Sequence, residues 1–314
     1  MTSQPGPTPA RAPEWARFLG DAGFQEFSGL IADYFDRRGV EFELDAEDGT
    51  LVPNIEALSK KSVFGLQNIA QKCAKAERER WPALVSEHFD SLFETGDSAN
   101  ALTVDMSSID DVRGRIRSRL YPESILKQTS AIVYRSIADG LIEVLVVDLP
   151  KSVRTVSRGE ADRWPLSDDE LFMIGRRNLS AGGFLNDVRV PLLGSLLHMY
   201  CGDTFYGASH LLVFERYLTD AMPYGMVLSA PKRDVILAHY IHNIGVLEAI
   251  NGIIQVTQGM YAEGPGSLSP HIYWYRNGGL TRLPYEEADG AFKFNPPGDF
   301  ADLLHALSAL SHLS

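Results

Sequence analysis

Hydrophobic and acidic residues alternate strictly from Val40 to Asp45, so that three apolar side chains share one face and three carboxylates share the other. This alternation predicts a half-buried strand. The pair Asp48-Gly49 follows as a turn signal, and residues 50–52 return as a short second strand. The pattern therefore predicts a hairpin near the start of the chain.

Elsewhere, apolar residues recur every three or four positions, which is the spacing of helices that bury one face. Helices are predicted over residues 15–37, 64–76, 81–93, 208–218, 246–258 and 301–313. A further helix is predicted through Val112, Ile116 and Leu120, with Ser107 and Ser108 as capping residues. Another is predicted through Leu171, Ile174 and Leu179. The helix through Leu171 should begin with a capping box, because Ser167 precedes Glu170 by three positions.

Further strands are predicted across short turn signals. They are residues 131–138 and 141–147 around Asp139-Gly140, residues 188–200 with a bend at Pro191 and Gly194, residues 224–228 and 235–239 around the turn at 231–234, and residues 271–275 before a turn at 277–279. Hairpins flanked by helices favour an α+β fold with a mixed or antiparallel sheet over a doubly wound parallel sheet.

The length of 314 residues allows about two domains. Four prolines and no apolar stretch in residues 1–13 predict a disordered N-terminus. We expect a small region of hairpin and helices over residues 14–100, followed by the larger α+β domain over residues 101–314.

Charge and composition narrow the classes of function. The chain has 29 basic and 41 acidic residues, and the resulting net charge of −12 opposes a nucleic-acid-binding surface. Two cysteines, Cys73 and Cys201, are too few for a disulfide framework, and Cys73 falls on the apolar stripe of a predicted helix, as a core residue would. No signal peptide and no run of about 18 apolar residues is present, so we expect a cytoplasmic protein without a membrane partner.

Four sequence motifs occur in order within residues 115–244. They are VVDLPKSV (146–153), WPLSDDEL (164–171) with Asn178-Leu179, FYGASHLL (205–212) and MVLSAPKRD (226–234). In this order they resemble the bacterial YtpQ-type family of unknown function. The resemblance implies an α+β protein of the bacterial cytoplasm, and it transfers no catalytic residue because the family offers none. The N-terminal hundred residues are not part of this pattern.

Five residues in and after the last two motifs are candidates for contact with a ligand or partner: Tyr206, Ser209, Arg233, Asp234 and His239. Arg233 can offer two parallel donors to an anion, although its turn can equally be structural. Ser209 lacks the Gly-x-Ser-x-Gly frame of a hydrolase nucleophile. No metal-ligand pattern completes a site around His239, and no phosphate-loop motif occurs, so no metal and no cofactor are expected.

Because no nucleophile–base frame stands out, we expect a non-enzymatic binding or adaptor protein whose partner is another protein or a second copy of itself. The alternative is an enzyme or small-molecule-binding protein with a pocket between the two regions. Self-association would use the aromatic strand around Trp274 or the amphipathic helix at the C-terminus.

Overall fold

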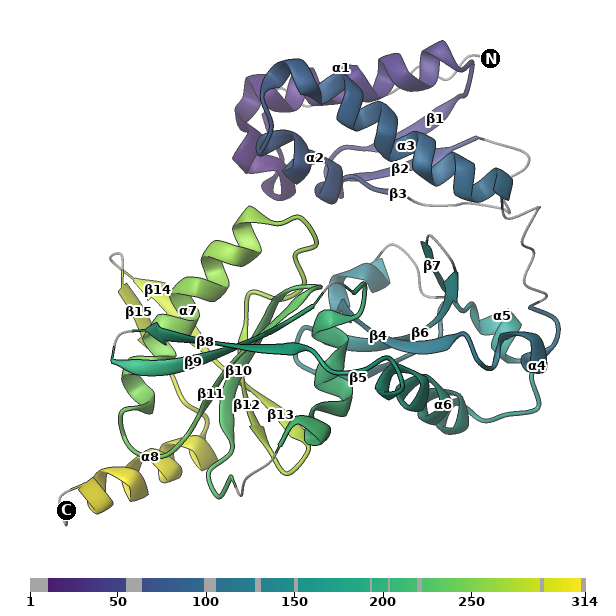
Figure 1. Ribbon diagram of the computed structural model, residues 1–314. Coiled ribbons are helices and arrows are strands. Elements are labelled where there is room, and N and C mark those ends of the chain that lie inside the picture. The colour runs from purple at the N-terminus through teal and green to yellow at the C-terminus, as the bar shows by residue number, and fades with distance from the viewer. Residues whose placement is uncertain are drawn as a thin grey trace. The chain divides into compact units, whose positions relative to one another are not determined.

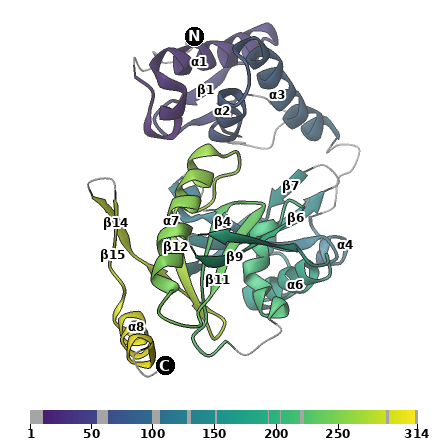
Figure 2. The ribbon, with the colours of Figure 1, turned by 60° about the vertical axis from the view of Figure 1, so that its left-hand side comes forward.

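The structure is a computed structural model, drawn in Figures 1 and 2. It describes residues 11–54, 64–98, 106–127, 131–149, 152–192, 194–202, 204–218, 222–288 and 291–311. The chain divides into two compact units, one formed by Met1–Val104 with Glu263–Pro265 and the other by Asp105–Ala262 with Gly266–Ser314. Residues 1–10, most of the segment expected to be disordered, lie outside the described residues.

The first unit packs helices against a small antiparallel sheet. Its elements are η1 (Glu14–Leu19), α1 (Gly20–Arg37), β1 (Phe42–Asp45), β2 (Thr50–Pro53), β3 (Phe64–Gly65), α2 (Gln67–Ala74), η2 (Arg78–Arg80) and α3 (Trp81–Ser98). The predicted hairpin is confirmed, since β1 and β2 pair antiparallel with Leu44 opposite Leu51. The core is aromatic, with Phe24, Phe27, Tyr34, Phe35 and Phe89 buried. Cys73 lies in this core, and burial raises the pKa of its thiol to about 11, which fits a packing residue.

The second unit holds the remaining elements. They are α4 (Ile109–Val112), β4 (Ile116–Pro122), η3 (Glu123–Lys127), β5 (Tyr134–Ala138), β6 (Leu141–Leu149), β7 (Ser152–Thr155), α5 (Arg158–Ala161), α6 (Asp168–Ser180), β8 (Asn186–Leu192), β9 (Ser195–Cys201), η4 (Gly207–Tyr217), β10 (Met226–Lys232), β11 (Val235–Tyr240), α7 (Val246–Glu263), β12 (Ile272–Arg276), β13 (Gly279–Leu283), β14 (Tyr285–Ala288), β15 (Ala291–Phe294) and α8 (Gly298–Ser311). Within the described residues, no helix is both long enough and apolar enough to cross a membrane.

The strands of the second unit form antiparallel sheets. One sheet has the order β13-β12-β10-β11-β9-β8, and a second has the order β4-β6-β5, with β7 also paired to β6. Strands β14 and β15 form a separate hairpin. Every pairing among the described strands of this unit is antiparallel. The expected α+β fold with an antiparallel sheet is therefore confirmed.

Local turn chemistry explains the hairpins that the sequence predicted. Gly140 takes φ of 81° in the turn between β5 and β6, a conformation that glycine adopts without strain. Asn277 and Gly278 have φ of 51° and 77° between β12 and β13, as a two-residue hairpin turn of type I′ requires. The capping box that opens α6 is also present, because Ser167 accepts a hydrogen bond from the Glu170 amide and the Glu170 carboxylate accepts one from the Ser167 amide.

The expected helix through Ile116 and Leu120 is wrong. Ser108 does cap a helix, but that helix, α4, ends at Val112, and the chain then enters strand β4. Residues four apart share a face both on a helix and on a strand, so Ile116 and Leu120 fit either period. The side chains between them decide the question, because Arg117 and Arg119 alternate with apolar and small neighbours, which is the period of a strand.

The six-stranded sheet is packed on both faces. On one face it shares a core with the second sheet and η4, formed by residues such as Val144, Phe214, Leu228 and Ile236. On the other face it packs on α7 and α8, through residues such as Val227, Leu237, Ile253 and Phe300. Figures 1 and 2 both show α7 beside this sheet.

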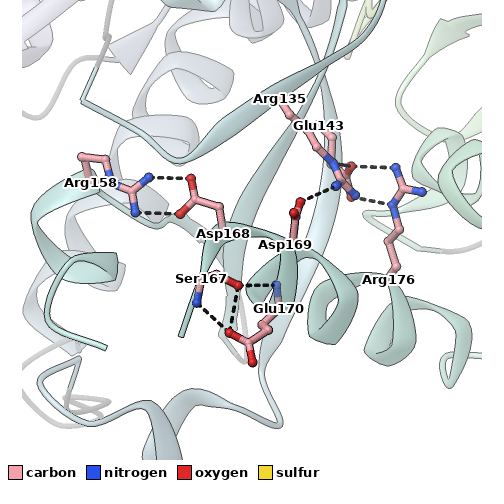
Figure 3. A network of polar contacts seen from close by, with 8 residues as sticks. All are labelled: Arg135, Glu143, Arg158, Ser167, Asp168, Asp169, Glu170 and Arg176. Atoms are coloured by element: carbon pink, nitrogen blue, oxygen red, sulfur yellow. Dashed lines mark hydrogen bonds and ion pairs between the residues drawn. The ribbon is translucent and has the colours of Figure 1, made fainter. Parts of the chain in front are cut away.

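An ionic network connects α6 to β6. Glu143 has no exposed surface, yet it carries a carboxylate into the packing between the strand and the helix. Its two oxygens accept hydrogen bonds from Arg176 at 2.9 and 2.8 Å, and Oε2 accepts a third from Arg135 at 2.5 Å (Figure 3). Arg135 also lies 3.7 Å from Asp169 near the start of α6. The buried charge is thereby neutralised from both sides.

Candidate functional site

Strand β4 carries a row of arginines. Side chains alternate along a strand, so Arg117, Arg119 and Tyr121 share one face of β4 while Ser118 and Leu120 share the other. Arg115 precedes the strand by one residue and continues the same spacing. Arg119 and Tyr121 are buried, whereas Arg115 and Arg117 line an open cavity.

A fourth arginine reaches this face from the turn between β10 and β11. The backbone of Arg233 is fixed on both sides, since its N–H donates to Gly266 O at 2.9 Å and its carbonyl accepts from Ala208 N at 2.8 Å. Its guanidinium carbon lies 5.9 Å from the centre of the Tyr121 ring, and that of Arg119 lies 5.3 Å from the same centre. Two guanidinium groups therefore lie near the same tyrosine ring.

The surroundings of Arg233 disfavour the positive charge of its guanidinium group. Its Nε atom is buried and has no hydrogen-bond partner among the described residues. Burial and the charge of Arg119 lower the pKa of the Arg233 guanidinium. Both effects disfavour a cation and would be relieved by an anion placed between the two arginines.

The cavity beside the arginines has a volume of about 670 Å³. Tyr206 forms part of its wall and donates a hydrogen bond from its hydroxyl to Asp148 Oδ1 at 2.9 Å. The Arg119 guanidinium carbon lies 5.9 Å from the Tyr206 ring, which joins the buried arginine to the cavity wall. Burial, followed by the charge of Asp148 and the hydrogen bond to it, raises the pKa of Tyr206, so its phenol stays protonated at neutral pH.

Positive charge is in excess around this cavity. Asp148 is the only acid in its described lining, and Tyr206 already donates to it. Arg117 donates to the backbone carbonyls of Gly114 and Ile116, and Arg119 donates to Tyr121. By contrast, eight arginines elsewhere in the described part of the chain form ion pairs: Arg38, Arg78, Arg135, Arg154, Arg158, Arg176, Arg189 and Arg282.

Across the described part of the chain, no carboxylate forms an ion pair with Arg115 and Arg117, which line the cavity, or with Arg119 and Arg233, which lie near Tyr121. We call these four residues, with Tyr121 and Tyr206, the arginine cluster. In a protein of net charge −12, such a cluster offers concentrated donors for an anion.

Aromatic side chains add an apolar component to the cavity. Phe184 and Phe205 line it and are 65% and 61% exposed. Large exposed rings next to a cavity are typical of surfaces that contact a ligand. The arrangement suits a molecule with an anionic end and an apolar or planar end.

Of the five sequence-predicted residues, Tyr206 lines the cavity and Arg233 lies near Tyr121, while the other three do not line the cavity. Tyr206 and Arg233 belong to the arginine cluster. Ser209 is buried behind it, where its hydroxyl accepts a hydrogen bond from Leu120 N at 3.1 Å and so satisfies the open edge of β4. Asp234 is exposed in the turn that follows Arg233. His239 lies on β11 with Nδ1 2.9 Å from Leu196 O, away from the lining of the cavity.

The arginines of β4 were not among the residues predicted from the sequence. Their signal was the alternation Arg-Ile-Arg-Ser-Arg-Leu-Tyr over residues 115–121, which a helical interpretation spreads around all sides of a helix. No group of three or more His, Cys, Asp or Glu side chains in the described part of the chain is arranged to hold a metal ion.

Comparison of the chain with protein-family models, with curated proteins and with solved structures gives no significant match in any of the three. The resemblance of residues 115–244 to the YtpQ-type family thus stays a prediction, and the functional argument rests on the geometry of the arginine cluster.

Proposed function

We propose that this protein binds a small anionic molecule in the arginine cluster, and that the recognised group is a phosphate. The observation that carries the proposal is the pair Arg119 and Arg233, which flank one tyrosine ring with no carboxylate ion-paired to either among the described residues. Guanidinium groups bind phosphate oxygens through paired hydrogen bonds, and two of them can hold a doubly charged group. This role develops the small-molecule alternative of the sequence analysis, with the pocket inside the second unit.

The size and lining of the cavity support a ligand larger than an inorganic ion. A volume of about 670 Å³ falls within the range of about 300–1,000 Å³ that is usual for ligand sites. The phosphate would lie between Arg119 and Arg233, while the cavity lined by Arg117, Phe184 and Phe205 would hold the rest of the same molecule. The protonated hydroxyl of Tyr206 stays engaged with Asp148, which keeps that carboxylate from facing the anion.

The test is isothermal titration calorimetry of the intact protein with inorganic pyrophosphate as the probe. Arg233→Gln and Arg119→Gln should each weaken binding by at least about tenfold, because each removes a charged donor. Arg163→Gln is the matched control, since Arg163 is exposed in the same unit and does not line the cavity. Binding should also weaken as salt rises.

Thermal unfolding of the same variants separates a binding role from a structural one. Removing an unpaired, partly buried charge should leave the melting temperature of Arg233→Gln unchanged or raise it. The proposal is refuted if pyrophosphate produces no binding heat at millimolar concentration, or if the arginine variants bind it as well as the wild type does.

A further inference from the structure

A second cavity, of about 580 Å³, lies over strands β8, β9 and β11 and is not used by the proposed function. Among the described residues, it shares only Phe184 and Leu185 with the lining of the first cavity. Strand alternation brings polar side chains together on its floor. Asp187 and Arg189 share a face of β8, and His198 and Tyr200 share the same face of β9, because Arg189 pairs with His198 and Asp187 with Tyr200.

His198 and Asp187 form an oriented pair. Nδ1 of the imidazole lies 3.0 Å from each carboxylate oxygen of Asp187. A carboxylate accepts hydrogen bonds, so it favours the tautomer with the proton on Nδ1 and leaves the lone pair on Nε2. Nε2 has no hydrogen-bond partner among the described residues, and His198 lines the cavity. This is the arrangement of a histidine held ready to accept a proton.

Two tyrosines supply a donor beside this histidine. The hydroxyls of Tyr200 and Tyr240 lie 2.9 Å apart, and the Tyr240 ring stands nearly perpendicular to the His198 ring at 4.9 Å between centres. One hydroxyl donates to the other, so one proton of the pair is left for a third group. Burial, followed by the hydrogen bond with Tyr240, raises the pKa of Tyr200, which keeps its phenol protonated.

Part of the rest of the lining suits an apolar acyl group. Leu196, Tyr217, Met222 and Ile241 line the cavity, together with the polar side chains of Arg216 and His242. An ester needs a base to activate water, a donor for the carbonyl oxygen and an apolar surface for its acyl chain. The described lining contains all three, and a free ester needs no further co-reactant besides water.

We propose that this cavity hydrolyses a small carboxylic ester with an apolar acyl chain. His198 Nε2 accepts a proton from water while the water oxygen forms a bond to the carbonyl carbon, and the carbonyl oxygen takes up the electron pair. The free hydroxyl of the Tyr200–Tyr240 pair donates to that oxygen. The electron pair on the carbonyl oxygen then re-forms the C=O bond as the C–O ester bond breaks, the leaving oxygen takes the proton from His198 Nε2, and the acid and the alcohol depart. Asp187 is a positioning residue that stabilises the imidazolium through Nδ1.

The test measures hydrolysis of p-nitrophenyl butyrate by the intact chain. His198→Asn should lower kcat/KM by about a hundredfold or more, as expected for loss of a general base. His305→Asn is the matched control because His305 is exposed on α8 and should leave the rate unchanged. Asp187→Asn should lower kcat with little change in KM, and Asp187→Glu should restore part of kcat.

A second measurement uses the unmodified fold. Diethyl pyrocarbonate acylates a free imidazole nitrogen, so in the folded wild type the rate of His198 acylation, followed by mass spectrometry, should equal the rate at which hydrolysis is lost. The proposal is overturned if the wild type hydrolyses the ester no faster than folded His198→Asn, or if hydrolysis survives complete acylation of His198. Neither result depends on anion binding by the arginine cluster.

Discussion

Replacing Glu143 by glutamine tests whether the ionic network under α6 stabilises the second unit. The substitution keeps the shape of the side chain but removes the charge that faces Arg135 and Arg176 (Figure 3). Removing one partner of a buried ion pair typically costs about 3–5 kcal/mol. Here the arginine side chains are 34% and 35% exposed, so water can rehydrate them in part. We therefore expect Glu143→Gln to lower the free energy of unfolding by about 2–3 kcal/mol.

The pH dependence of this loss gives an independent check. Burial alone would raise the pKa of the Glu143 carboxyl, but the hydrogen bonds from Arg176 and Arg135 outweigh it, so the folded pKa is lowered. The stabilisation is then complete above the unfolded pKa of about 4.3 and is lost as pH falls through the folded value. The difference between the wild type and Glu143→Gln should therefore shrink below about pH 4.

The assay is urea-induced unfolding followed by circular dichroism at pH 7 and again at acidic pH, with thermal melts alongside. A loss of 2–3 kcal/mol corresponds to a melting temperature lower by about 4–12 °C for a unit of this size. Glu287→Gln is the control, because Glu287 is exposed on β14 and should change stability by less than about 0.5 kcal/mol. Equal stability of Glu143→Gln and the wild type at pH 7, or a difference that persists unchanged at acidic pH, would refute the reasoning.

Three further substitutions test the hydrogen bond at the edge of β4, the packing of η4 on the β10–β11 turn and the cap at the start of α6. Ser209→Ala leaves the buried amide of Leu120 without its acceptor and should cost about 1–3 kcal/mol in urea unfolding, and an unchanged midpoint would contradict this role. Gly207→Ala places a Cβ 2.6 Å from the backbone carbonyl of Asp234, so the melting temperature should fall by the equivalent of about 1–3 kcal/mol; a wild-type melt would show that the turn moves freely. Ser167→Ala removes the cap of α6 and should cost about 1 kcal/mol, and a loss below a few tenths would count against the capping box as a stabilising feature.

Some elements carry their signal within their own few residues, and these could be predicted from the sequence. The hairpin of β5 and β6 follows from Asp139-Gly140, because a tight turn needs a residue that accepts positive φ at that point. The start of α6 follows from Ser167 and Glu170, because the side chain of each accepts a hydrogen bond from the amide of the other. In both cases the signal and its cause lie within a few residues of one another.

The arginine cluster could be predicted only in part. Tyr206 and Arg233 each stood out in a short motif, but their proximity depends on the fold: the backbone of η4 packs on the β10–β11 turn, where Ala208 N donates to Arg233 O. Arg119 was missed because the four-residue spacing of Ile116 and Leu120 fits helix and strand alike. Its pairing with Arg233 across Tyr121 is a tertiary contact, and no local pattern encodes it.

The most direct test of the account follows the side-chain Nε–Hε signals of the arginines by ¹⁵N NMR during a titration with inorganic pyrophosphate. The signals of Arg119 and Arg233 should shift together, because the anion accepts hydrogen bonds from both guanidinium groups. Both shifts should saturate at the same pyrophosphate concentration as the calorimetric heat. The signal of exposed Arg163 should stay in place. If the signals of Arg119 and Arg233 remain fixed while pyrophosphate binds, the anion lies elsewhere and the arginine cluster is not its site.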